Sequence, residues 1–289
     1  MPVDNVLKLV GNTPLIKIDG IYVKLETTNP TGSIKDRMAK YLIEQAEQRG
    51  ELVNKKRIVE VTSGNTGIAF SMIASIKGFE FIAVMPESMS AERVKMMKSF
   101  GAKVILTPAK EDVGGAVKKY KELIKKYNQT WLPKQFENKD NIEGHKKGIG
   151  KEIADQIPAV EVFVAGIGTG GTLLGVGKAL KEKNPHVKII GVEPAESAVL
   201  NNKKSGLHKI QGIGEGFIPE LVKENINLID EVIEIKSSDA IKMQKKIATK
   251  YGLLVGISSG ANFIAAKKLK KKYNTVVTVF PDRGERYLS

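Results

Sequence analysis

The chain alternates short runs rich in β-branched residues with longer amphipathic stretches, and no other sequence feature limits the possible folds as strongly. Strands are predicted at 57–62, 79–86, 103–108, 160–166, 188–194, 228–235 and 274–281. Helical patterns lie among them, and strands that are connected through helices pair in parallel. The sequence therefore predicts an α/β protein with two open, twisted, mostly parallel sheets flanked by helices. Its active site is expected in the cleft between the two halves, where open α/β sheets place ligands.

Composition excludes several classes of protein. The chain has no cysteine, so disulfides, zinc–thiolate sites and thiol nucleophiles are ruled out. The three histidines, His145, His186 and His208, lack metal-ligand spacing, which argues against a metal site or a His-based triad. No apolar run approaches the roughly 18 residues that cross a bilayer, and no signal-peptide pattern is visible. A cytoplasmic location without membrane contact is predicted.

The net charge of +14 raises the alternative of nucleic-acid binding. The lysines are spread through helical stretches such as 118–127 and 265–273, where they alternate with apolar residues. This pattern favours solvated helix faces over a nucleic-acid site. A steep salt dependence of DNA or RNA retention would mark the alternative.

Lys35 stands in the segment NPTGSIKDR (29–37), a turn that leads into a helical pattern at 38–50. Near a helix N-terminus the dipole disfavours an added positive charge. A lysine in this place can form an imine, which is how pyridoxal-phosphate enzymes hold their cofactor. On its own the position is more typical of a surface lysine.

The segment TSGNTG (62–67) follows a predicted strand and opens a helix, a geometry that presents backbone N–H groups to an anion. Thr62, Ser63 and Thr66 add hydroxyl groups, and Asn65 adds an amide. Helix capping alone explains some of these residues. Five consecutive small or polar residues exceed what capping requires, so an anion site is favoured.

The segment GIGTGGT (166–172) again joins a strand to a helix, and its glycines permit close backbone approach to a phosphate. Gly166, Gly168 and Gly171 also fit the dinucleotide fingerprint, with Glu193 at the end of the next strand. An NAD-dependent oxidoreductase is therefore a second hypothesis. It leaves GSIKDR and TSGNTG unexplained.

A fourth segment, LVGISSGAN (254–262), runs from strand-like residues through a Ser-Ser-Gly turn into a helix. Alone it is typical of a capped helix. Beside the other three segments it becomes a candidate hydrogen-bond partner for a heteroaromatic nitrogen.

Together these motifs resemble one family, the cysteine synthases and cystathionine β-synthases of the tryptophan-synthase-β-like fold (fold type II) of pyridoxal-phosphate enzymes. The resemblance covers nearly the whole chain. It rests on GNTPL (11–15), YVKLE (22–26), NPTGSIKDR, TSGNTGIA, MPESMSAER (85–93), GIGTGGTLLGVG, GVEP (191–194), HKIQGIGEGFIP (208–219), GISSGAN and GERYLS (284–289).

The resemblance implies a role for each site residue. Lys35 resembles the catalytic Schiff-base lysine, and Asn65 the partner of the cofactor's ring hydroxyl oxygen. The loop Gly168, Thr169, Gly170, Gly171 and Thr172 resembles the phosphate cup. Ser258 resembles the partner of the pyridine nitrogen, with Ser259 as the alternative. The expected pocket for the substrate carboxylate is formed by Thr62, Ser63, Thr66 and Gln135.

The activity implied is a β-substitution that uses pyridoxal 5'-phosphate and no metal. O-acetyl-L-serine and sulfide would give L-cysteine and acetate through an aminoacrylate imine. Alternatives are O-phosphoserine as donor, or another nucleophile such as the homocysteine of cystathionine β-synthases. The resemblance also implies a homodimer and a possible complex with serine acetyltransferase. It divides the chain into a smaller domain, 36–137, and a larger domain formed by 1–35 and 138–289.

Overall fold

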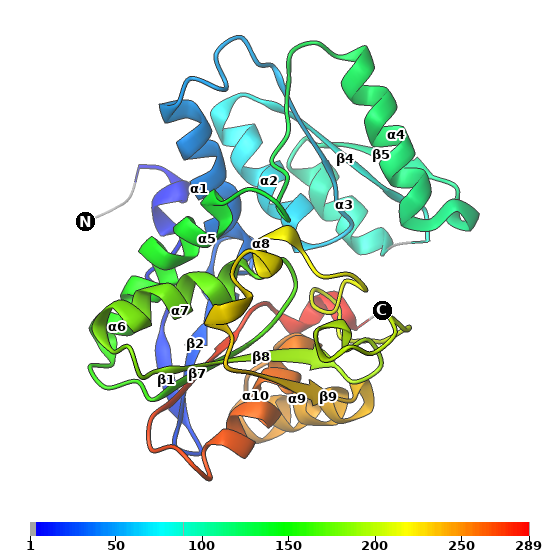
Figure 1. Ribbon diagram of the computed structural model, residues 1–289. Coiled ribbons are helices and arrows are strands. Elements are labelled where there is room, and N and C mark those ends of the chain that lie inside the picture. The colour runs from blue at the N-terminus through cyan, green and yellow to red at the C-terminus, as the bar shows by residue number, and fades with distance from the viewer. Residues whose placement is uncertain (1–3, 89, 289) are drawn as a thin grey trace. The chain divides into compact units, whose positions relative to one another are not determined.

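The structure is a computed structural model, and it describes residues 4–88 and 90–288 (Figure 1). Met89 of the MPESMSAER motif and Ser289 of GERYLS lie outside the described residues, as do residues 1–3. The chain divides into two compact units, which are described separately. The larger one contains Lys8–Ile34 and Gln135–Ser289, and the smaller one contains Lys35–Lys134 with Asn5–Leu7.

The smaller unit is built on a four-stranded parallel sheet with the strand order β5-β4-β3-β6. Its strands are β3 (Arg57–Val61), β4 (Glu80–Pro86), β5 (Lys103–Thr107) and β6 (Thr130–Trp131). Its helices are α1 (Lys35–Gln48), α2 (Asn65–Lys77), α3 (Ala91–Ser99) and α4 (Asp112–Lys126).

Apolar side chains of the central strands point alternately to the two faces of this sheet, and both faces are buried. Val59, Ile82 and Val84 pack against α4 through Ala116 and Leu123. The neighbouring residues on β3 and β4 point to the opposite face, because side chains alternate along a strand. There Phe81 stacks on Phe70 of α2, with 5.8 Å between ring centroids. This double burial explains the nearly continuous apolar runs in the sequence.

The larger unit is built on a six-stranded sheet with the order β1-β2-β10-β7-β8-β9. The strands are β1 (Leu15–Ile18), β2 (Ile21–Leu25), β7 (Val162–Gly166), β8 (Lys188–Pro194), β9 (Glu231–Ile235) and β10 (Val276–Phe280). Only the hairpin of β1 and β2 is antiparallel, and its turn is Asp19-Gly20, both residues having positive φ. Asp-Gly is a strong signal for such a turn.

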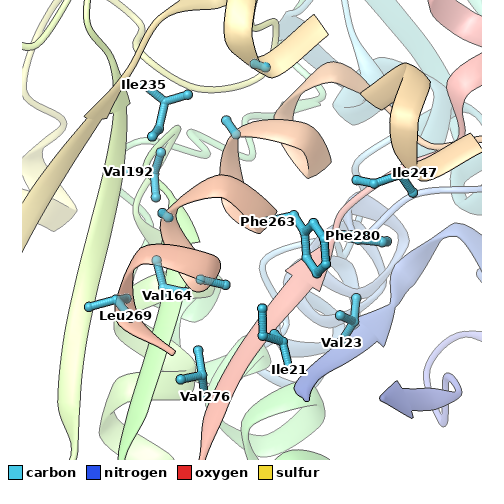
Figure 2. Close-up of a cluster of buried hydrophobic side chains, with 14 of the residues drawn as sticks. Ile21, Val23, Val164, Val192, Ile235, Ile247, Phe263, Leu269, Val276 and Phe280 are labelled. Atoms are coloured by element: carbon cyan, nitrogen blue, oxygen red, sulfur yellow. The ribbon is translucent and has the colours of Figure 1, made fainter. Parts of the chain in front are cut away.

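Two groups of helices cover the two faces of the six-stranded sheet. On one face α9 (Ser237–Tyr251) and α10 (Ile257–Leu269) enclose a core to which β7 contributes Val162 and Val164 (Figure 2). On the other face Phe163 and Ala165 belong to a second core. The helices of the second group are α5 (Asp140–His145), α6 (Lys151–Gln156), α7 (Gly171–Lys183) and α8 (Glu220–Lys223). Each strand end is thereby fixed from both sides, and the loops that follow the strands are held in place.

The predicted fold class is confirmed: two mainly parallel sheets are flanked by helices. All seven predicted strands exist, although β9 begins at Glu231 because Ile226–Leu228 forms a 3-10 turn. The β1–β2 hairpin and the short strand β6 were not among the predicted strands. Within the described residues, no helix is both long enough and apolar enough to span a membrane.

Candidate functional site

Lys35 is the first residue of α1, so the predicted location near a helix N-terminus is confirmed. The segment that precedes it belongs to the larger unit. There Ile34 N–H donates to Pro281 O (2.8 Å), and Ser33 forms a β-bridge with Asp282. The backbone that leads into Lys35 is therefore fixed by the end of β10.

The segment 281–287 also holds the backbone that leads into Ser258. Gly256 N–H donates to Asp282 O (3.0 Å), and Gly284 N–H donates to Leu254 O (3.1 Å). On its other side Arg283 Nε donates to Thr27 O (2.8 Å). The segment 281–287 is thus bonded to the backbone just before Lys35 and just before Ser258, the two predicted cofactor contacts. Nothing in the sequence of this segment predicts that role.

The 62–67 loop connects β3 to α2, and its shape is set by Thr62. Thr62 is nearly buried, and its Oγ1 accepts N–H bonds from Gly67 (3.2 Å) and, more weakly, from Gly64 (3.4 Å). A hydroxyl has two lone pairs and one hydrogen. Because both lone pairs serve the loop, the O–H of Thr62 is left as a donor for an anion.

The segment opens a helix as predicted: Asn65 and Thr66 belong to the first turn of α2, with Gly64 as its N-cap. The backbone N–H groups of a helix start carry partial positive charge. Arg93 of α3 lies beside the loop, and its Nη1 donates to Ser63 O (3.5 Å). The sequence interpretation did not single out Arg93, although it stands in the quoted MPESMSAER motif.

The 166–172 loop connects β7 to α7, whose first residue is Gly171. Its backbone shape requires glycine at position 170, the N-cap, which has φ of +86°. A Cβ there would also lie 2.5 Å from Val222 Cγ2. At the start of a 13-residue helix the loop therefore has backbone groups that no side chain covers, an arrangement that suits a phosphate group.

Two side chains of α5 contact the threonines of this loop. Asn141 Nδ2 donates to Thr169 Oγ1 (3.0 Å) and to the backbone oxygen of Gln135 (2.8 Å). His145 Nε2 lies 3.4 Å from Thr172 Oγ1. Neither α5 residue was a candidate from the sequence. Their short helix has six residues, and no local pattern connects it with a loop 28 positions away.

Ser258 and Ser259 lie inside the first turn of α10 rather than in a turn before it. Both are buried, and Ser259 Oγ has no hydrogen-bond partner among the described residues. The preceding Val255 forms an isolated bridge with Arg283 instead of a strand. Which serine contacts the ring nitrogen stays a prediction.

The predicted site residues fall into two groups by unit. The smaller unit holds Lys35, Thr62, Ser63, Asn65 and Thr66, and the larger unit holds Gln135, Gly168, Thr169, Gly170, Gly171, Thr172 and Ser258. Within each unit they occupy the start of a helix or the loop before it, apart from Gln135, which lies just ahead of α5. Among residues 4–88 and 90–288, no three His, Asp or Glu side chains are grouped as a metal site would require.

Glu193 tests the dinucleotide hypothesis. Its side chain is only 2% exposed, and its Oε2 accepts the N–H of Leu200 (3.1 Å). Burial, with a smaller contribution from nearby Glu234, raises the pKa of this carboxyl to about 7. A carboxyl that is buried and bonded to its own turn does not suit the recognition of a ribose.

Comparisons with known proteins agree on one family. The sequence model of the pyridoxal-phosphate dependent enzymes matches residues 6–282, including the GIGTGGT loop, so the NAD-dependent hypothesis is dropped. A cysteine synthase of Staphylococcus aureus (strain Mu50) is 44% identical, with 100% of this chain and 96% of that protein covered.

Two solved structures are similar over the full length of this chain. The crystal structure of cysteine synthase from Entamoeba histolytica has a TM-score of 0.96 at 39% identity, covering 100% of this chain and 90% of that chain. The O-acetylserine dependent cystathionine β-synthase of Helicobacter pylori has a TM-score of 0.93 at 41% identity, covering 100% and 99%.

Proposed function

Because the chain belongs to the pyridoxal-phosphate dependent enzymes, we propose that it converts O-acetyl-L-serine and sulfide into L-cysteine and acetate. The 44% identity to a cysteine synthase over the whole chain is the observation that supports this reaction most strongly. When bound, pyridoxal phosphate withdraws electron density from the α-carbon of an amino acid. The remaining tasks fall to side chains and backbone groups of this chain.

The 168–172 loop is proposed to hold the cofactor's phosphate. A phosphate needs donors, and the loop offers the first N–H groups of α7 together with the hydroxyls of Thr169 and Thr172. It also needs close approach, and Gly170 has no room for a Cβ. The residues present therefore fit the group.

Lys35 is proposed to hold the aldehyde carbon of the cofactor covalently and to move the proton at the α-carbon of the substrate. A neutral amine is required for both tasks. The start of α1 favours the neutral form, because the helix dipole is positive there. Asn65, at the start of α2, is proposed to bond to the ring hydroxyl oxygen.

Thr62, Ser63, Thr66 and Gln135 are proposed to bind the substrate carboxylate. The Thr62 hydroxyl is suited to this task, since its lone pairs are used by Gly64 and Gly67 and its O–H is left to donate. The loop that carries it therefore needs no rearrangement to receive an anion.

Ser258 is proposed as the partner of the pyridine nitrogen, with Ser259 as the alternative. A hydroxyl, unlike a carboxylate, does not stabilise a protonated ring nitrogen. This weaker electron withdrawal suits prompt elimination of a leaving group from the β-carbon.

A second nucleophile is a separate candidate, because the Helicobacter pylori protein that matches this chain is a cystathionine β-synthase dependent on O-acetylserine. We further propose a homodimer in the cytoplasm that can bind serine acetyltransferase. Light scattering of the purified protein, alone and with that enzyme, checks these proposals. A monomeric mass would contradict the first of them.

The reaction is tested with Lys35→Ala and, as matched control, Lys40→Ala on the same helix, where Lys40 only approaches Glu44 (3.9 Å). Borohydride reduction of the holoenzyme should attach the cofactor to the peptide that contains Lys35. We expect Lys35→Ala to abolish this attachment and to lower kcat by at least about 10²–10⁴-fold, the usual contribution of a general base. Lys40→Ala should match the wild type.

Attachment at another lysine, or undiminished turnover in Lys35→Ala, would contradict the assignment. The donor is identified by absorbance titrations with O-acetylserine, O-phosphoserine and serine. It is the compound that changes the cofactor's spectrum at the lowest concentration. Sulfide and homocysteine, added next, identify the nucleophile by the one that restores the starting spectrum.

A further inference from the structure

Asn141 is completely buried on α5, although asparagine is mostly found at the surface. It reaches its position because α5 lies directly on α7. A Cβ on Gly175 of α7 would be 2.5 Å from Ile142 O, and one on Gly171 would be 2.0 Å from Asn141 Oδ1. Gly175 thus lets the backbone of α5 approach α7, and Gly171 makes room for the Asn141 side chain.

The contacts of Asn141 determine which way its amide points. The atom that lies 2.8 Å from Gln135 O must be a donor, because a backbone carbonyl only accepts, so it is Nδ2. The second hydrogen of the same nitrogen goes to Thr169 Oγ1 at 3.0 Å. Oδ1 has no hydrogen-bond partner among the described residues. Leaving a buried acceptor unsatisfied costs stability, and native proteins retain few such groups.

Thr169 Oγ1 accepts a second bond, from the N–H of Gly171 (3.2 Å). Both of its lone pairs are then occupied, by one side-chain donor and one backbone donor. The only hydrogen-bonding capacity that remains to this hydroxyl is its own hydrogen. Thr169 is thereby restricted to donation, which is what a phosphate oxygen requires.

We infer that Asn141 is a positioning residue that keeps the Thr169 hydroxyl a donor to the cofactor's phosphate. The inference rests on the proposed function. It also explains why the amide bridges two segments: Gln135 O orients Nδ2, and Nδ2 orients the hydroxyl of Thr169. An amide in the opposite orientation, or a carboxylate, would make Thr169 donate inward and would remove that donor from the phosphate.

The test measures the affinity and release rate of pyridoxal phosphate, and the ³¹P chemical shift of the bound cofactor, in Asn141→Ala and Asn141→Asp. The matched control is Asn184→Ala. Asn184 lies in the larger unit just after α7, donates to one carbonyl (Val160 O, 3.3 Å) and accepts the N–H of His186 (3.1 Å), and makes no bond to the loop.

We expect Asn141→Ala to weaken cofactor binding about 10- to 100-fold, the effect of losing one hydrogen bond to a charged group. Asn141→Asp, although closer in shape to asparagine, should weaken it at least as much and should shift the ³¹P signal. Asn184→Ala should bind within about twofold of the wild type. In a Thr169→Val background, Asn141→Ala should add little, while Thr169→Ser should retain binding.

Each failure has a distinct meaning. If the wild type does not bind pyridoxal phosphate, the proposed function fails. If it binds, but Asn141→Ala and Asn141→Asp resemble Asn184→Ala, only the inference is overturned. Should the Asn141 variants not fold, the side-chain amide signals of Asn141 in ¹⁵N-labelled wild type decide. They must move when the cofactor is added, and unchanged signals overturn the inference.

Discussion

The two strand-to-helix loops, 62–67 and 166–172, use the same device in different ways. In each, a threonine Oγ1 accepts two N–H bonds, which leaves its hydrogen to donate. Thr62 receives both bonds from the backbone of its own loop. Thr169 receives one from its own loop and the other from Asn141, on a separate helix.

The N-cap glycines of the two loops also differ in how strongly their surroundings constrain them. Gly64, the N-cap of α2, has φ of −123°, and a Cβ there would have Arg93 Nη1 as its nearest neighbour at 3.9 Å. Gly170, the N-cap of α7, has φ of +86° and no room for a Cβ. The first loop is therefore locally determined, whereas the second depends on the segments packed around it.

Gly170→Ala should produce the largest effect. A left-handed alanine costs about 1–2 kcal/mol, and overpacking against Val222 costs a similar amount, so the free energy of unfolding should fall by about 3 kcal/mol. Urea denaturation of the protein without cofactor measures this. Unfolding at the wild-type urea concentration would contradict the claim that packing fixes this loop.

Glu193→Gln probes the larger unit beside the phosphate loop, since β8 pairs with β7 there. Burial raises the pKa of Glu193 from 4.5 to about 7, so the folded state binds more protons than the unfolded state between these values. Stability should therefore fall as pH rises through this window, by about 3 kcal/mol in total. Glutamine cannot ionise and keeps an acceptor for Leu200 N–H, so the variant should be the more stable one at about pH 8 and lose its advantage near pH 5.

The control for this pH dependence is Glu234→Gln on the adjacent strand. The hydrogen bond from Lys203 keeps the pKa of Glu234 below its ordinary value, so Glu234 stays ionised across the same window. Its loss should leave most of the slope of stability against pH between about 5 and 8 in place, because burial is the main cause of the raised pKa of Glu193 and Glu234 a smaller one. Equal slopes for the wild type and Glu193→Gln would refute the role of Glu193.

The contrast between the loops also shows what the sequence can predict. Thr62 and the helix start after it were predictable, because a strand, a small polar loop and a helix are consecutive in the chain. The glycines of the second loop were predictable for the same reason, and the family match confirms the predicted cofactor. Asn141 and the segment 281–287 were not, since their contacts with the segments of the site join residues that are far apart in the chain, from 26 positions for Gly256 and Asp282 to 256 for Thr27 and Arg283.

Other misses had a visible signal. The β1–β2 hairpin was absent from the predicted strands, although Asp19-Gly20 is a frequent hairpin turn. Ser90, a residue type preferred at N-caps, occupies that position of α3. Its hydroxyl, however, makes no capping bond, so sequence preference identified the place but not the interaction.

Thr62→Val should have an intermediate effect, on the binding of the substrate and not on the binding of the cofactor. Valine removes the O–H donor and also the acceptor of the Gly64 and Gly67 N–H groups. The dissociation constant for O-acetylserine should therefore rise by at least about tenfold, the effect of one hydrogen bond to a carboxylate. Cofactor release should stay at the wild-type rate, whereas Thr169→Val should show the reverse pattern. Thr62→Ser keeps the hydroxyl and should restore binding. If both valine variants affected substrate and cofactor equally, the two loops would not have separate tasks.

Gly64→Ala should have the smallest effect and is the direct counterpart of Gly170→Ala. Alanine is compatible with a φ of −123°, and its Cβ would meet only the far end of a guanidinium at ordinary contact distance. The free energy of unfolding should stay within about 0.5 kcal/mol of the wild type. Urea denaturation of the two alanine variants, measured together, tests whether glycine is required by the backbone of the 166–172 loop but not by that of the 62–67 loop. A loss in Gly64→Ala as large as that in Gly170→Ala would mean that both helix starts are held equally tightly.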